Sequence, residues 1–216
     1  FMRKGNMFKE QHYQVIKNLI SPDVAELGYR YLLNKRRVFT FLHQNKLINP
    51  FSTHWGWMDD PTVKDTWATY GDVFFDTILA EKKEAIEKAI DFKLVETYTY
   101  GRLYKHGDIL KRHKDRPSCQ ISATMFLGGE PWSIYVDNTG GTNNPGIKVD
   151  LEPGDCLMYR GCELEHWRDQ FKGEICGQVF FHYNDANDPM SEKNKFDDRP
   201  ILGLPQCTSS WIRNEN

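Results

Sequence analysis

The spacing of apolar residues along the chain changes near its middle, from a helical period to alternation. Segment 72–90 (DVFFDTILAEKKEAIEKAI) carries its apolar residues on one helical face and Lys and Glu on the other, which predicts an amphipathic helix. A second helix is predicted over 22–33, with a continuation toward His43, because Ser21 followed by Pro suits the N-cap and first helical positions. A shorter helix is expected over 61–70.

Alternation of apolar and polar residues dominates from 92 onward. Segment 92–100 (FKLVETYTY) is typical of a strand, and turn residues such as Gly-Gly, Pro-Gly-Asp and the Asn- and Gly-rich stretch 138–146 separate further candidates. Those candidate strands are 120–127, 132–136, 147–151, 155–159 and 175–183, with an earlier one at 13–20. Helices therefore precede strands, which is the order of an α+β fold.

The length of 216 residues suits one domain, 1–216, in three sections. We expect an N-terminal strand and helices over 13–91 and a strand-rich core over 92–185. The last section, 186–216, is polar, contains three prolines and predicts a C-terminal tail.

Composition narrows the class of protein. Lys and Arg number 28 against 30 Asp and Glu, a net charge of −2, which argues against nucleic acid or an anionic membrane as the main partner. No apolar run approaches the roughly 18 residues of a membrane span. The five cysteines are odd in number and form no C-x-x-C pair, so we expect a reducing compartment rather than a disulfide framework. The N-terminus shows no sorting signal, and the expected location is the cytoplasm.

Two His-x-Asp triplets carry the candidate chemistry. His106-Gly-Asp lies in a turn-like segment, whereas His113-Lys-Asp115 directly precedes a predicted strand. His and Asp two residues apart in extended chain point to the same side, and His166 on a neighbouring strand can complete one face of an octahedron. Two imidazoles and one carboxylate in that arrangement suit non-haem Fe(II), with three positions left open.

This ordered set of features resembles the 2-oxoglutarate- and Fe(II)-dependent oxygenases, and within them it is most similar to the prolyl 4-hydroxylase group. The features are Tyr104-x-x-Gly107-x5-His113-x-Asp115, then Pro153-Gly154-Asp155, His166 and the closing strand. The N-terminal strand, Ser21 and helix also look like that group, so the resemblance covers roughly 13–185. The resemblance implies a double-stranded β-helix (jelly-roll) core with supporting N-terminal helices. It also implies that His113, Asp115 and His166 hold the iron and that Tyr104 contacts 2-oxoglutarate.

One departure from that family concerns the far carboxylate of 2-oxoglutarate. The family places a Lys or Arg nine to twelve residues after the distal His, but 175–178 contains no base. Because a buried carboxylate without a cation is costly, the charge must come from elsewhere. Arg160 is the expected anchor, with Gln178 as a neutral donor. Arg168 and Lys172 lie closer to the distal His, in a predicted polar turn that favours a solvated role.

The leading hypothesis is an enzyme that uses Fe(II), 2-oxoglutarate and O2 to hydroxylate an unactivated C–H bond, with room for ascorbate as an extra reductant. The prolyl hydroxylase resemblance favours a prolyl residue in a peptide or protein as the substrate. A small-molecule 2-oxoglutarate oxygenase is one alternative, and a non-catalytic, cupin-like module that binds a metal or sugar is another. His182, on the last strand, is expected in the core more than in the site.

Overall fold

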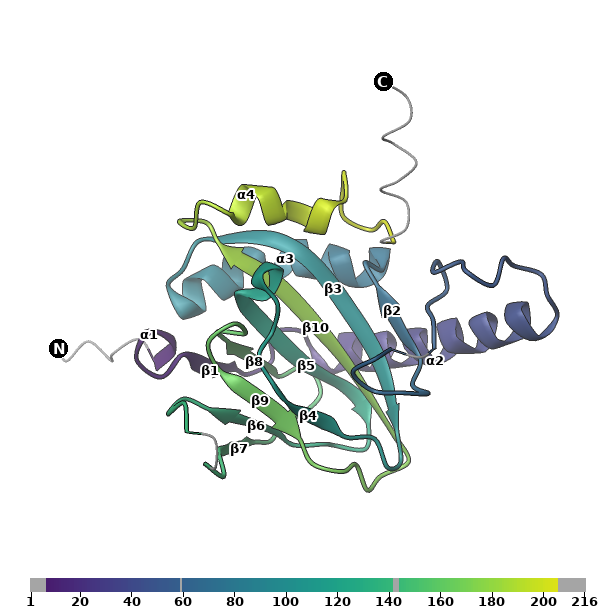
Figure 1. Cartoon of the computed structure of the whole chain (residues 1–216), viewed down its shortest axis with the longest axis horizontal. Coiled ribbons are helices and arrows are strands. Elements are labelled where there is room, and N and C mark those ends of the chain that lie inside the picture. The colour runs from purple at the N-terminus through teal and green to yellow at the C-terminus, as the bar shows by residue number, and fades with distance from the viewer. Residues whose placement is uncertain (1–6, 59, 142–143, 206–216) are drawn as a thin grey trace.

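Two antiparallel sheets pack against each other in the computed structural model, which describes residues 7–58, 60–141 and 144–205 (Figure 1). The six-stranded sheet has the order β1-β8-β5-β10-β3-β2 and the four-stranded sheet the order β4-β9-β6-β7. The larger sheet consists of β1 (Tyr13–Ile16), β2 (Ala68–Tyr70), β3 (Leu94–Lys105), β5 (Ile121–Gly129), β8 (Cys156–Tyr159) and β10 (Ile175–Asp185). The smaller consists of β4 (Leu110–His113), β6 (Ile134–Asp137), β7 (Ile147–Val149) and β9 (Glu165–Arg168).

Two long helices cover the outer face of the larger sheet, as Figure 1 shows. These are α2 (Pro22–Gln44) and α3 (Val73–Ile90). Ser21 caps α2 by accepting the Val24 N–H at 3.3 Å, as the sequence predicted. The apolar faces of the helices pack on the outward side chains of the central strands.

The inner face of the larger sheet follows from the two-residue period of its strands. Along β10, Val179 and Phe181 pack toward the helices, whereas Phe180 and His182 face the space between the sheets. Tyr98 and Tyr100 on β3 face the same space, because they pair with His182 and Phe180. The predicted α+β class and double-stranded β-helix architecture are thus confirmed.

Several predicted elements differ in extent or type. Segment 61–70 is not a helix: it contains turns and then β2, whose Thr and Tyr pair with β3. The pairing overrides a helical propensity that is weak for β-branched and aromatic residues. The first strand ends at Ile16, and the polar strands β4 and β9 were not predicted. The remaining short elements are α1 (Met7–Gln11), α4 (Ser191–Asn194), and the 3₁₀ turns η1 (Pro117–Cys119) and η2 (Lys195–Asp198).

Among the helices that the structure describes, none combines the length and apolarity needed to cross a membrane. The part of the predicted tail beyond Pro205 lies outside the described residues.

Candidate metal centre

Three predicted metal ligands come together where β4 and β9 pair. His113 ends β4 and is the direct cross-strand partner of His166 on β9, and Asp115 follows two residues after His113. One ligand atom from each side chain can be chosen so that all three lie within 4.8 Å of one another. Short distances of this kind let one metal ion contact all three groups from a single side.

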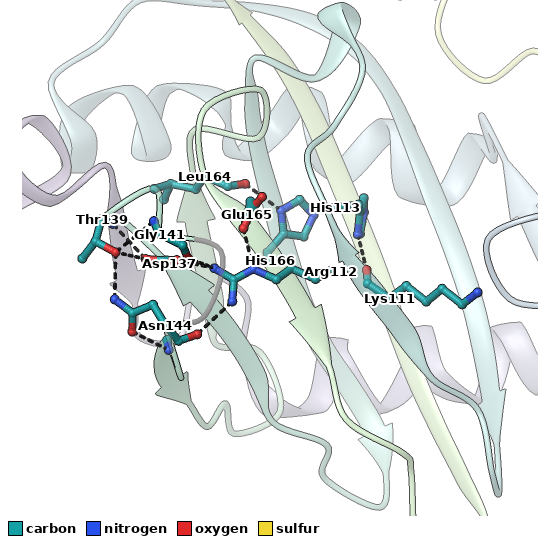
Figure 2. Close-up of polar contacts among 11 residues, drawn as sticks. Lys111, Arg112, His113, Asp137, Thr139, Gly141, Asn144, Leu164, Glu165 and His166 are labelled. Carbon is teal, nitrogen blue, oxygen red and sulfur yellow. Dashed lines mark hydrogen bonds and ion pairs between the residues drawn. The ribbon is translucent and has the colours of Figure 1, made fainter.

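Both imidazoles turn the same nitrogen toward the cluster. Figure 2 shows His113 Nδ1 donating to the Lys111 carbonyl at 2.7 Å and His166 Nδ1 donating to the Leu164 carbonyl at 3.1 Å. Because a carbonyl can only accept, these bonds place the protons on Nδ1 and leave a lone pair on each Nε2. The Nε2 atoms of His113 and His166 lie 3.7 and 3.4 Å from Asp115 Oδ1. Both rings therefore have the tautomer that metal ligation requires.

The protonation states of His113 and Asp115 also favour metal binding. Burial lowers the pKa of His113, and the neighbouring His166 lowers it further, which favours the neutral ring. Burial by itself would raise the pKa of Asp115, but the adjacent His166 ring and the hydrogen bond accepted from Ser122 hold that pKa well below its usual value. Ser122 Oγ donates to Asp115 Oδ2 at 2.7 Å, and the Asp115 N–H donates to the Gly161 carbonyl at 2.8 Å. The carboxylate is thus ionised and oriented before any metal binds.

A network of charges on the opposite face of the smaller sheet fixes the two histidine-bearing strands together (Figure 2). Arg112, next to His113, forms ion pairs with Glu165, next to His166, and with Asp137 on β6. The other acceptors for its guanidinium are the carbonyls of Gly141 at 3.0 Å and Asn144 at 2.8 Å. The Arg112 side chain therefore holds β4 against β9 and β6 without contacting the three predicted metal ligands.

A cavity of about 560 Å³ opens over the cluster. Its wall is mainly aromatic, formed by Trp57, Tyr70, Tyr98, Tyr100, Tyr104, Tyr159 and Phe180. Two arginines in the wall already have acidic partners. Arg102 pairs with Asp60 at 2.7 Å, and Arg116 binds both carboxylate oxygens of Asp197 at 2.8 and 2.6 Å. The size and lining suit a small ligand or the side chain of a larger one.

Solved structures share this architecture. A prolyl-4-hydroxylase from Pseudomonas putida superposes with a TM-score of 0.55 at 14% identity, covering 84% of this chain and 96% of that one. HygX from Streptomyces hygroscopicus, with nickel and 2-oxoglutarate bound, gives 0.56 at 12% identity, covering 87% and 89%. The fold is that of the 2-oxoglutarate oxygenases. A prolyl hydroxylase from Trichoplax adhaerens, in complex with a hypoxia-inducible-factor peptide fragment, gives 0.56 at 14% identity over 88% of each chain. No protein-family profile and no curated protein sequence matches the chain.

The residues predicted for 2-oxoglutarate fall in different places. Tyr104 is fully buried and lines the cavity. Gln178 is also buried, on the inner face of β10, and its Oε1 accepts from Thr124 at 3.3 Å. Arg160 is not in the cavity. It pairs with Glu163 at 2.8 Å outside the space between the sheets, so its predicted role as the carboxylate anchor is wrong.

Arg168 also differs from its prediction, because it is buried where a solvated position was expected. It lies on β9 rather than in a polar turn, and it is only 1% exposed. Burial lowers its pKa, and the groups that act against this effect are Cys176, Tyr104 and Tyr159, none of them a carboxylate. The sequence carried a usable signal, because a residue two positions after His166 in extended chain shares its face of the sheet.

Two other histidines lie in different environments. His182 lines the cavity, where its Nδ1 lies 3.0 Å from Ser122 Oγ and its ring packs at 4.5 Å on Tyr98, so the core interpretation was incomplete. His106 contacts the carbonyls of Lys172 and Gly173 and takes no part in the metal cluster.

Proposed function

We propose that this protein is an Fe(II)- and 2-oxoglutarate-dependent dioxygenase. The observation that carries the proposal is the cluster of His113, Asp115 and His166, with both Nε2 lone pairs directed at one carboxylate and an aromatic cavity beside them. Two nitrogens and one oxygen on a single side of a metal match the ligand set of non-haem Fe(II), with positions left for a chelating ligand and O2. The shared fold supports the same assignment.

The chain's own residues would bind and shield the reactants. Bound iron and 2-oxoglutarate would supply the chemistry that activates O2, one atom of which would enter the substrate and the other the succinate that forms with release of carbon dioxide. Asp115 enters the site ionised and burial favours the neutral form of His113, so neither side chain has to lose a proton before it ligates a metal. Tyr104 supplies a phenolic donor in the cavity wall, and the surrounding aromatic rings exclude water.

We propose a prolyl residue in a peptide or protein as the substrate. An aromatic wall suits the flat face of a proline ring, and a cavity open to solvent accepts a side chain while the peptide stays outside. The likeness to prolyl hydroxylases from two organisms supports this choice. The cavity volume also favours a second candidate, an intact small molecule, and a HygX structure contains hygromycin B.

Succinate formation tests the enzyme class directly. The full chain, loaded anaerobically with Fe(II), is exposed to O2 and 2-oxoglutarate with ascorbate, with and without proline-containing peptides or small-molecule candidates. We expect succinate to form only when iron is present and to form faster with the true substrate. Mass spectrometry should show that this substrate gains one oxygen atom. His113→Ala should abolish the signal. Absence of both metal and 2-oxoglutarate binding would contradict the proposed function.

A further inference from the structure

One buried cation beside the metal cavity has no counter-charge among the described residues. Arg168 follows His166 by two residues on β9, so both side chains project from the same face of the smaller sheet, into the space between the sheets. Its Nη2 donates to Thr124 Oγ1 at 3.1 Å, and its Nη1 donates to the Trp132 carbonyl. Its Nε is buried and has no partner within the described part of the chain. The guanidinium is therefore held in place but left with an unused donor.

Other deeply buried cations of this chain are paired with a carboxylate. Arg199 pairs with Asp76 at 2.8 Å, and Arg102 pairs with Asp60 at 2.7 Å. Across the described residues, no carboxylate lies within ion-pair distance of Arg168. Burying an unpaired charge costs several kcal/mol, so such a group persists where a ligand supplies the missing charge.

The surroundings of Arg168 suit the end of a small anion. Thr124, which accepts from Arg168, also donates to Gln178, so a hydroxyl and an amide lie next to the guanidinium. Tyr104 lines the cavity and packs edge-on against Trp132 at 4.9 Å, and Arg168 lies over the same Trp132 ring at 5.3 Å. A planar guanidinium fork with neutral donors beside it matches a carboxylate.

We propose that Arg168 binds the far carboxylate of a dicarboxylic 2-oxo acid whose other end lies at the metal, with Thr124 and Gln178 as neutral partners. This inference rests on the proposed function. Two residues of extended strand span about 6.6 Å, so β9 presents a metal ligand and a cation one repeat apart on one face. Arg168 on the smaller sheet would thus take the role that the family gives to a Lys or Arg at 175–178 on the larger sheet.

A pair of ligands that differ only in the far carboxylate tests the proposal. The full chain is loaded with Mn(II), which avoids turnover, and titrated calorimetrically with 2-oxoglutarate and with 2-oxopentanoate. We expect Arg168→Met to weaken 2-oxoglutarate binding by about 10- to 100-fold, the range for a hydrogen-bonded charge. Binding of 2-oxopentanoate and of Mn(II) should stay within about twofold. Arg160→Met is the matched control and should change neither ligand.

The outcomes separate the two proposals. If the wild-type chain binds Mn(II) but not 2-oxoglutarate, the proposed function fails and this inference fails with it. If the wild-type chain prefers 2-oxoglutarate and Arg168→Met keeps the same preference, only the role of Arg168 is overturned. Should the Met variant lose Mn(II) binding through misfolding, Arg168→Gln removes the charge but keeps a polar side chain. A wild-type ratio of the two affinities in that variant would also refute the proposal.

Discussion

Gly161 lies against Asp115, the carboxylate of the proposed metal site, and adding one methyl group there should damage the site. A Cβ built on Gly161 would lie 2.4 Å from Asp115 Oδ2, 2.4 Å from the Cys119 carbonyl and 2.7 Å from Ser122 Oγ. The φ angle of Gly161 is not in the left-handed region, so alanine is acceptable to the local backbone. The steric conflict therefore falls on the neighbours of Gly161.

The size of the effect follows from these distances. Ordinary contacts of a Cβ begin at 3.4 Å, so Asp115 or the segment carrying it must retreat by about 1 Å. Overpacking of this kind costs about 1–3 kcal/mol of folding free energy. Moving Asp115 also separates it from the Ser122 hydroxyl that orients it, and loss of such an orienting contact weakens metal binding by about 10- to 100-fold.

Metal titration and thermal unfolding measure the two effects separately. Gly161→Ala should bind Mn(II) about 10- to 100-fold more weakly than the wild type and unfold at lower temperature. Gly28→Ala is the control: it lies within α2, its Cβ would make ordinary contacts of 3.5 Å with Leu127 and Phe75, and it should gain about 0.5–1 kcal/mol. Wild-type Mn(II) affinity in Gly161→Ala would refute the geometry derived for the carboxylate.

Three further predictions concern ligation, pH and a buried ion pair. His113→Ala should abolish Mn(II) binding in a titration while His106→Ala retains it, and the reverse result would identify the other triplet as the site. Burial lowers the pKa of His182 from 6.5 to about 4, so the unfolded chain binds a proton that the folded chain does not. Urea unfolding of chelator-treated protein should then show about 3 kcal/mol of stability lost between pH 6.5 and pH 4, and His182→Gln should remove most of that slope. Arg199→Met should cost about 3–5 kcal/mol in urea unfolding, because it leaves Asp76 buried and unpaired, and a loss below about 1 kcal/mol would contradict this reasoning.

The sequence predicted best the elements that bury a wide apolar surface. The helix at 72–90 has a clear apolar face, and Asp72 caps it by accepting from Phe74 N at 2.9 Å. The central strands were found because they are rich in β-branched and aromatic residues. The strand at 110–113 (LKRH) and that at 165–168 (EHWR) were missed, because their polar side chains form ion pairs and the proposed metal site and do not follow the apolar pattern of a core.

The error over Arg160 has a simple physical origin. Along β8, Leu157 and Tyr159 face the space between the sheets, whereas Cys156 and Met158 pack toward the helices. Because alternation places Arg160 on the side of Met158, this residue could not reach the cavity without a bulge. Its backbone N–H instead donates to the His12 carbonyl at 3.0 Å, and its side chain lies over Phe92.

Strand β9 shows how four residues can divide structural and chemical tasks by alternation. Glu165 and Trp167 lie on one face, where Glu165 pairs with Arg112 and Trp167 stacks on Tyr135 at 5.5 Å. His166 and Arg168 lie on the other face, buried and directed between the sheets. A one-residue slip of this strand would exchange the two sets and lose both the network and the site at once. The Glu165–Arg112 ion pair therefore favours the register of β9 in which His166 and Arg168 face the space between the sheets.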